Sequence, residues 1–243
     1  VESLPEQISY QGKTVSTADF LVGMLAEMDL RGYRDEAIRA AAVVATTQLT
    51  VAYQTTGTAD GLTVQTAEEA KKAWGDYWFS QYWPQLQQAV SATWGQRLIK
   101  EGERYSAKVF PVSWGQTAEG IQCPYDFTSN DYERTVKVSL EAFALVFPEY
   151  THSLTVKKAQ SGRVETVTSG KGALSGTEVA TKFDLPSPSF SIAVTQSAAV
   201  FTCYGNGNGE GMSLYAANEL AKRGESYQAI LAYFYPDATL SGT

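Results

Sequence analysis

The chain has 243 residues, of which 26 are acidic and 19 basic, giving a net charge of −7. An apolar fraction of 44%, with 5 Trp, 14 Tyr and 10 Phe, is enough for a sizeable core and excludes a disordered or low-complexity protein. The acidic balance argues against a nucleic-acid partner, because no basic stripe is available to neutralise phosphates. No apolar run approaches the roughly 20 residues of a membrane span.

The first part of the chain is predicted to be helical. Thr17 is the expected N-cap of a helix whose apolar residues recur every three to four positions until residues 29–32 interrupt it. A second helix is predicted over residues 33–53, with a face of small residues that lets another backbone approach closely. Thr66 and Glu69 then form a capping-box signature that opens a third helix.

This third helix carries six aromatic residues between Trp74 and Trp83, before Pro84, which is expected to bend or restart it. Two interpretations are open. The aromatic residues can form a platform on which sugars stack, or the helix can be hydrophobic all round and buried in the core. The sequence favours the buried helix.

From about residue 96 onward the pattern changes to short β-branched runs separated by Gly, Ser and Pro. Two helices are predicted near the end of the chain. The clearest strand segments are residues 135–138, 164–167 and 190–194, and the two helices are residues 213–222 and 227–233.

This order of elements predicts an α+β fold, with a helical N-terminal half followed by mostly antiparallel strands and C-terminal helices. We expect one domain over residues 1–243. A division into a helical part, about residues 1–95, and a strand-rich part, residues 96–243, remains open.

The residues available for metal, nucleotide or nucleophilic chemistry are few. Cys123 and Cys203 can form a disulfide or remain thiols, and with the single histidine, His152, they are too few for a zinc site. A Ser-His-Asp triad would have to use His152. The glycine-rich residues 205–211 lack the Lys-Ser/Thr ending of a phosphate loop, and Glu210 would repel a phosphate. We therefore expect neither a metal nor a cofactor.

Two carboxylates flank the break between the first two helices. Glu27 lies at the end of an apolar helix, where partial burial would raise its pKa, the condition that a general acid needs near neutral pH. Glu36 opens the second helix. On these facts alone, a surface glutamate at a helix end is the alternative.

Residues 20–28 and 36–45 resemble the opening signature of the stage II sporulation protein D family, which reads approximately YLxGVVxxEMP and then EALKAQAVAARTY. Further ordered matches cover nearly the whole chain, and their collinearity carries the resemblance. They are residues 74–76, 89–95, 123–126, 161–164, 174–176, 209–213, 221–224, 227–231 and 235–236.

The resemblance implies a peptidoglycan lytic transglycosylase that acts on glycan strands outside the cytoplasmic membrane during engulfment of the forespore. Such an enzyme needs a single carboxylic acid and no paired second carboxylate. By position, Glu27 matches the glutamate of EMP and is the expected acid/base. Glu36 matches the glutamate of EALKAQA and is the second candidate, or else a structural partner. The matched segments also imply a set of substrate-binding residues: Ser113, Asn208, Met212 and Ser213.

The chain departs from the family pattern at several polar positions, where histidines or arginines are replaced. This depletion leads to a second hypothesis, a catalytically impaired relative that binds peptidoglycan or an envelope protein. The departures are Thr46 and Thr181 for arginine, Gln48 for tyrosine, Asn208 for histidine, Leu214 for glutamine, and residues 110–116 without histidine.

The expected partners are peptidoglycan glycan strands, together with other sporulation or cell-wall proteins. The chain begins at Val1 without Met, from which we expect that an N-terminal signal or membrane anchor has been removed and that the protein is extracytoplasmic.

Overall fold

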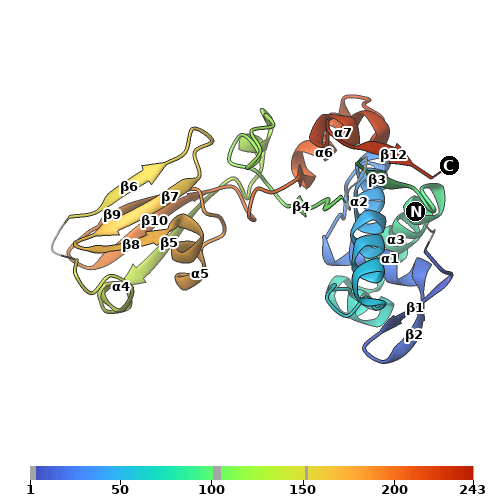
Figure 1. Ribbon diagram of the computed structural model, residues 1–243, viewed down its shortest axis with the longest axis horizontal. Coiled ribbons are helices and arrows are strands. Elements are labelled where there is room, and N and C mark those ends of the chain that lie inside the picture. Colours follow the sequence, from blue (N-terminus) through green and yellow to red (C-terminus); the bar gives the residue numbers. More distant parts are fainter. Residues whose placement is uncertain (1–3, 101–104, 151–152, 243) are drawn as a thin grey trace. The chain divides into compact units, whose positions relative to one another are not determined.

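The computed structural model describes residues 4–100, 105–150 and 153–242 (Figure 1). Long helices occupy most of the first hundred residues, and short strands with shorter helices follow. The pairings with a defined register are antiparallel. The predicted α+β class is therefore confirmed.

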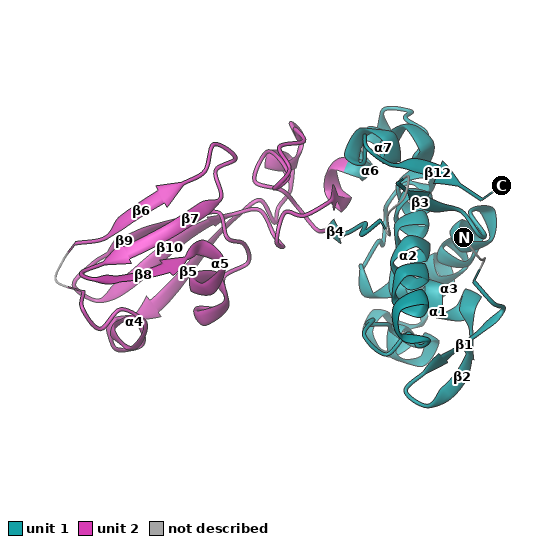
Figure 2. Cartoon of the chain, in the orientation of Figure 1, with its two compact units in different colours: residues 1–109, 217–243 teal, residues 110–216 magenta. Residues whose placement is uncertain are grey.

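The chain forms two compact units (Figure 2). Unit 1 contains residues 1–109 and 217–243, and unit 2 contains residues 110–216. The boundaries fall within β4 (Val109–Phe110) and α6 (Leu214–Lys222). The helices that end the chain thus belong to the same unit as the N-terminal helices.

Unit 1 opens with a hairpin that the sequence pattern did not reveal. Strand β1 (Gln7–Tyr10) pairs with β2 (Lys13–Ser16) across the two-residue turn of Gln11 and Gly12. Both turn residues have positive φ, 49° and 73°. Such a turn matches the right-handed twist of the flanking strands, which explains how so short a loop closes the hairpin.

Helix α1 (Thr17–Glu27) begins one residue earlier than predicted, because Ser16 rather than Thr17 is its N-cap. The Ser16 hydroxyl accepts the N–H of Asp19 at 3.3 Å. The helix is almost entirely buried, and Gly23 allows the backbone near Gln65 to pack directly on it. A Cβ at Gly23 would lie 2.7 Å from the Gln65 carbonyl oxygen, too close for any side chain.

Helix α2 (Asp35–Thr56) confirms the second predicted helix with shifted ends. Its small residues are fully buried, Ala40, Ala41 and Ala45 among them, so neighbouring elements approach its backbone closely. It ends at Gly57, whose φ of 74° provides the left-handed C-cap.

Helix α3 (Ala67–Ala92) begins at the predicted capping box of Thr66 and Glu69. The helix is interrupted at Gly75 (φ 79°, ψ 162°), whereas Pro84 lies inside a continuing helical segment. The bend expected at Pro84 is therefore found nine residues earlier, at a residue without a Cβ that adopts this conformation readily.

The remaining elements of unit 1 come from both ends of its sequence. Strand β3 (Arg97–Ile99) pairs with β12 (Thr239–Ser241), and α7 (Tyr227–Phe234) packs against α2. Both C-terminal helices confirm the sequence expectation with only small shifts at their ends.

Unit 2 contains two three-stranded antiparallel sheets, ordered β5-β10-β9 and β6-β7-β8, with a helix attached to each. Smaller elements are the helical turn η1 (Asp126–Thr128) and the strand β11 (Met212–Ser213), which pairs with β4. The main elements are β5 (Glu133–Ser139), α4 (Leu140–Val146), β6 (Thr155–Lys158), β7 (Val164–Ser169), β8 (Gly172–Ser175), α5 (Gly176–Lys182), β9 (Phe190–Val194) and β10 (Ala198–Tyr204).

The two sheets and the two short helices share one core built around aromatic side chains. Phe143 of α4 stacks on Phe183 with ring centroids 5.8 Å apart, and Phe201 of β10 contacts both rings. Cys203 is buried in the same core and is a free thiol. Aromatic and β-branched packing thus stabilises unit 2 without a disulfide between the two cysteines.

No helix in residues 4–100, 105–150 or 153–242 is long and apolar enough to cross a bilayer.

Candidate functional site

Glu27 is the last residue of α1, directly after a run of buried residues from Phe20 to Ala26. Its side chain is exposed, so the partial burial expected from the sequence is wrong. Within the described part of the chain, the Glu27 carboxylate has no hydrogen-bond or ion-pair partner. The helix places a free carboxylate at the surface of unit 1, where a ligand can reach it.

The loop that follows Glu27 is held by an ion pair. Two guanidinium nitrogens of Arg31 donate to the carboxylate of Asp29, one of them at 2.7 Å, and this hydrogen bonding raises the pKa of Arg31. The same guanidinium lies over the ring of Trp74 at 5.6 Å from its centroid. Arg31 therefore connects the loop after Glu27 to α3 through a cation–π contact.

Five of the six aromatic residues of α3 are exposed or half-buried, so the buried-helix interpretation is wrong. Trp74 alone of the six is buried, whereas Tyr77 is 68% and Trp78 46% exposed. Trp78 stacks on Tyr82 with centroids 5.6 Å apart, and Tyr77 meets Trp78 edge-on at 5.0 Å. We call Tyr77, Trp78 and Tyr82 the aromatic surface of α3.

Glu36 has a different environment from Glu27, because its carboxylate is fully engaged. One oxygen accepts from Arg39 at 2.5 Å, and the other accepts the backbone N–H of Tyr227 at 2.7 Å. Tyr227 is the first residue of α7. Glu36 therefore satisfies an otherwise unpaired helix N-terminal N–H and fastens α7 to the start of α2.

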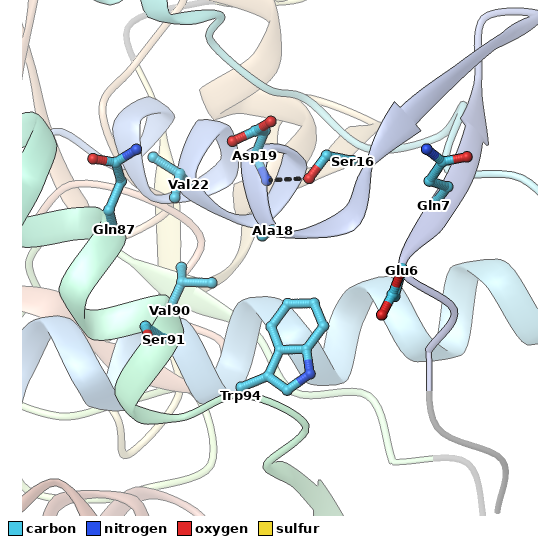
Figure 3. Close-up of a pocket in the computed structure, with 10 residues that line it drawn as sticks. All are labelled: Glu6, Gln7, Ser16, Ala18, Asp19, Val22, Gln87, Val90, Ser91 and Trp94. Atoms are coloured by element: carbon cyan, nitrogen blue, oxygen red, sulfur yellow. Dashed lines mark hydrogen bonds between the residues drawn. The ribbon is translucent and has the colours of Figure 1, made fainter.

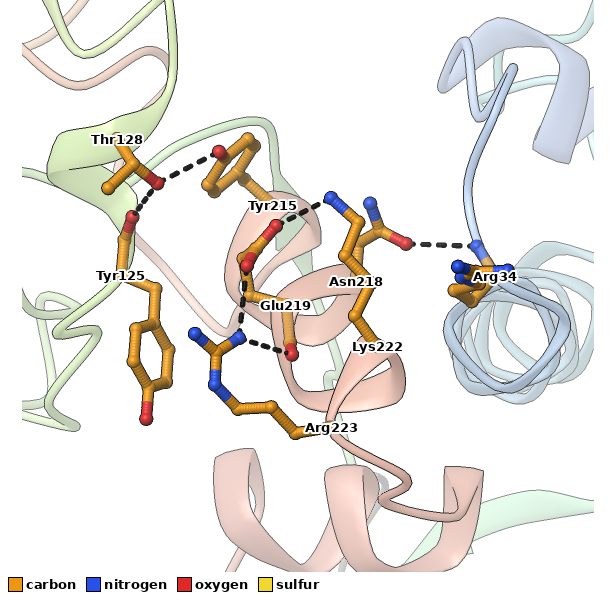
Figure 4. A network of polar contacts seen from close by, with 8 residues as sticks. All are labelled: Arg34, Tyr125, Thr128, Tyr215, Asn218, Glu219, Lys222 and Arg223. Atoms are coloured by element: carbon orange, nitrogen blue, oxygen red, sulfur yellow. Dashed lines mark hydrogen bonds and ion pairs between the residues drawn. The ribbon is translucent and has the colours of Figure 1, made fainter.

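A second bond joins the C-terminal helices to the same end of α2. The side-chain oxygen of Asn218 on α6 accepts the backbone N–H of Arg34, the N-cap of α2, at 2.9 Å (Figure 4). On the same helix, Glu219 is paired with Lys222 and Arg223, and the hydrogen bond from Lys222 lowers the pKa of Glu219. The surroundings of Glu36 are thus a structural junction.

Three of the four predicted substrate-binding residues are buried in unit 2, and two of them meet at a carboxylate that the sequence did not single out. The backbone N–H of Ser113 donates to one oxygen of Asp126 at 2.7 Å, and the Ser213 hydroxyl donates to the same oxygen at 2.6 Å. Ser113, Ser213 and Asp126 are each fully buried, as is Met212. In the sequence, the feature that could have identified Asp126 is its position at the end of the matched Cys-Pro-Tyr-Asp segment, residues 123–126.

Ser213 also caps α6, because its hydroxyl oxygen accepts the N–H of Ala216 at 3.2 Å. Nearby in unit 2, the Tyr215 and Thr128 hydroxyls lie 3.0 Å apart (Figure 4). The fourth predicted residue, Asn208, is exposed and its side-chain oxygen accepts the N–H of Glu210 at 3.0 Å. These bonds organise local structure, and Asn208 does not join the Asp126 group.

The two cysteines are buried free thiols. Burial, with a further contribution from the charge of Asp126, raises the pKa of Cys123 to about 12, and burial raises that of Cys203 to about 11. Both are therefore protonated at neutral pH and are poor nucleophiles or metal ligands. His152 lies outside the described residues.

Asp19, the third residue of α1, lines two open cavities formed by described residues of unit 1. One, of about 530 Å³, is bounded by the hairpin, α1 and the end of α3 (Figure 3). The other, of about 390 Å³, is lined by Tyr10, Phe20 and Trp83 and by the backbone around Gly23. Glu27 is not among the residues lining either cavity.

No protein-family model matches the chain. Two curated proteins resemble it over 94% of its length, which corresponds to 75% of theirs. They are stage II sporulation protein D of Bacillus amyloliquefaciens, 25% identical, and stage II sporulation protein D of Bacillus subtilis strain 168, 24% identical. These alignments span nearly the whole chain, as the collinear motifs do, so the chain is similar to stage II sporulation protein D over nearly its whole length.

Proposed function

We propose that this protein acts on the cell wall during sporulation, as a peptidoglycan lytic transglycosylase that uses Glu27 as its single acid/base. The observation that carries this proposal is the free, exposed carboxylate of Glu27 at the end of a rigid buried helix. Of the two candidate glutamates, Glu36 is committed to Arg39 and Tyr227. The similarity to stage II sporulation protein D supports the cell-wall assignment, and an extracytoplasmic location is part of the same proposal.

In the proposed reaction, the protonated Glu27 donates its proton to the glycosidic oxygen as the bond to the muramyl C1 breaks. The resulting carboxylate then accepts the proton of the muramyl 6-hydroxyl, whose oxygen bonds to C1. Cleavage therefore gives a 1,6-anhydro ring without consuming water, and Glu27 returns to its starting protonation state.

The aromatic surface of α3 supports binding of a glycan near this residue. It lies on the helix that Arg31, from the loop after Glu27, contacts through Trp74. Exposed Trp and Tyr rings present flat apolar faces beside polar edges, which suits a sugar ring with apolar faces and polar rims.

A second candidate function, glycan or envelope-protein binding without catalysis, is favoured by the replaced family positions. The Thr46 hydroxyl donates to the Ala42 carbonyl at 2.9 Å, and the Thr181 hydroxyl donates to the Thr177 carbonyl at 3.0 Å. Both groups are satisfied by their own helices, and neither carries the positive charge of an arginine. Loss of groups that stabilise developing charge typically costs about 10²–10³ in rate for each group.

The test is a digest of purified, peptide-stripped glycan strands, with 1,6-anhydro-muramyl ends measured by mass spectrometry. Wild type is run beside Glu27→Gln, Glu36→Gln and, as a matched surface control, Glu225→Gln. We expect anhydro products from wild type and the control, and none from Glu27→Gln. Residual products from Glu36→Gln are expected, in proportion to the folded fraction of that variant.

Two other outcomes contradict the enzyme assignment. If wild type gives no products but is retained on glycan, the binding function holds instead. If Glu27→Gln remains active, Glu27 is not the acid. A sample that neither cleaves nor binds glycan would contradict both candidate functions.

A further inference from the structure

The larger of the two cavities lined by Asp19 has a distinctive composition. Its floor carries the ring of Trp94, which is 46% exposed. Figure 3 shows this ring with Glu6, from the segment before β1, on one side and Val90 and Ser91, from the end of α3, on the other. Asp19 of α1 lines the cavity as well. Three separate segments therefore converge on one exposed indole.

The charge of this pocket is negative. Glu6 and Asp19 are both exposed, and in the described part of the chain neither carboxylate makes an ion pair or a hydrogen bond. No basic side chain is among the described residues that line it. Arg97 lies near Trp94 but lines a separate cavity of only about 30 Å³. An anionic ligand is thus disfavoured and a cationic one attracted.

The other polar groups of the pocket are neutral. Gln7 and Gln87 contribute amides, and Ser91 contributes a hydroxyl. These groups donate and accept hydrogen bonds, so they can orient a polar ligand without preferring either sign of charge. A volume of about 530 Å³ lies within the roughly 300–1,000 Å³ of small-ligand sites.

We propose that this pocket binds a ligand carrying a primary ammonium group, with the cation over the face of Trp94 and beside the carboxylate of Glu6. Tryptophan offers the strongest cation–π partner among the aromatic side chains, the free Glu6 carboxylate adds a charge-assisted hydrogen bond, and Asp19 adds to the negative field of the pocket. The ligand is either an amino sugar or the free amine of a peptide, because both present the same group.

This site is separate from the proposed catalytic residue. Asp19 precedes Glu27 by about two turns of α1, which corresponds to roughly 12 Å along the helix axis. The inference goes beyond the proposed function and does not depend on catalysis, since none of its residues takes part in the proposed reaction. A failure of either proposal leaves the other intact.

The test uses probe pairs that differ only in the acetylation of their amines, with binding to the full chain measured by titration calorimetry and NMR. The sugar arm compares a glucosamine tetramer with an N-acetylglucosamine tetramer. The peptide arm compares lysine amide with Nε-acetyl-lysine amide, each with a blocked α-amine. We expect the amine of at least one pair to bind at least about tenfold more tightly than its acetylated partner, and the stronger arm identifies the source.

Variants assign the binding to the pocket. Glu6→Gln and Trp94→Ala are each expected to weaken amine binding several-fold, with Trp94→Phe in between, and Asp19→Asn is expected to weaken it less, through the field of the pocket alone. Glu225→Gln removes one exposed negative charge from the same unit outside the pocket, so it is expected to leave binding unchanged. Raising the salt concentration should weaken amine binding, because exposed charges are screened.

The proposal is overturned by equal affinity within both pairs, by the absence of amine binding in both arms, or by amine binding that survives Trp94→Ala and Glu6→Gln. Tighter binding of the acetylated sugar would indicate a neutral-sugar site instead and would likewise overturn it. Circular dichroism of each variant establishes that it is folded.

Discussion

The backbone N–H of Tyr227 donates a 2.7 Å hydrogen bond to the carboxylate of Glu36, although 191 residues separate them in sequence. The same carboxylate accepts from Arg39 on its own helix. Glu36, which matches the glutamate of the EALKAQA motif by position, thus serves as the attachment point of α7. This relationship separates the two glutamates that the sequence left as alternatives.

Replacing Glu36 should therefore reduce the stability of the fold more than it reduces the cleavage activity of the folded protein. Glu36→Ala leaves the first N–H of α7 without its partner, and we expect a loss of about 1–2 kcal/mol in the free energy of unfolding. Urea unfolding at pH 7 measures this loss. Glu36→Gln retains one acceptor oxygen and should lose less. Full stability of Glu36→Ala, together with lost cleavage activity, would instead assign Glu36 to catalysis.

The buried carboxylate of Asp126 is expected to be important for the stability of unit 2. It accepts from the Ser113 N–H and the Ser213 hydroxyl, so Asp126→Ala leaves two buried donors unpaired and should cost about 2–4 kcal/mol. Hydrogen exchange of unit 2 amides reports this loss. Asp131 is a matched control, because its pair with Arg134 is about half exposed and Asp131→Ala should cost less than about 1 kcal/mol. Equal losses for the two variants would contradict this role.

The cysteines make stability depend on pH in the alkaline range. The native thiols have pKa values of about 12 and about 11, against an ordinary value near 9. Above pH 9 the unfolded chain releases these protons while the native chain retains them, so stability falls as pH rises from about 9 toward 12. The slope is at most about 1.4 kcal/mol per pH unit for each thiol.

Urea unfolding at pH 8, 9 and 10 measures this dependence, with Cys123→Ala as the matched variant. Other groups also titrate in this range, so the comparison of slopes isolates the thiol. We expect a shallower decline in Cys123→Ala than in wild type. Identical slopes would show that Cys123 ionises as readily in the native state as in the unfolded state.

The aromatic surface of α3 should contribute to glycan binding. Trp78→Ala removes a ring that is 46% exposed and stacked on Tyr82, and we expect roughly three- to tenfold weaker retention on peptide-stripped glycan. Leu145→Ala, at a residue 82% exposed in unit 2, controls for the loss of surface apolar area. If both variants bind as wild type does, the aromatic surface has another role.

The sequence predicts structural features correctly where they depend on interactions between residues close together in the chain. The Thr66–Glu69 capping box forms as predicted, because its hydrogen bonds join residues three apart. The strand over residues 190–194 and the two C-terminal helices also form. The N-cap of α1 was misplaced by one residue, since Ser16 and Thr17 are both good caps and only the observed bond to Asp19 decides between them.

The errors arose where exposure or distant contacts decide the outcome. The aromatic residues of α3 were assigned to a core because the pattern shows no polar face, whereas Gly75 breaks the helix and leaves Tyr77 and Trp78 at the surface. The expected burial of Glu27 failed because α1 ends there and the buried run stops at Ala26. Neither fact can be read from residue types alone, because exposure depends on which elements pack alongside.

By itself, the sequence determined the α+β class, the order of helices and strands, the capping of α3 and the similarity to stage II sporulation protein D through collinear motifs. Tertiary structure alone decided that Glu36 anchors α7, that Ser113 and Ser213 share the buried Asp126, and that Glu6, Asp19 and Trp94 line one cavity. The physical reason is the distance along the chain over which each kind of interaction acts. Propensity and capping act over a few residues, whereas a carboxylate's role depends on which partners the fold brings to it from far along the chain.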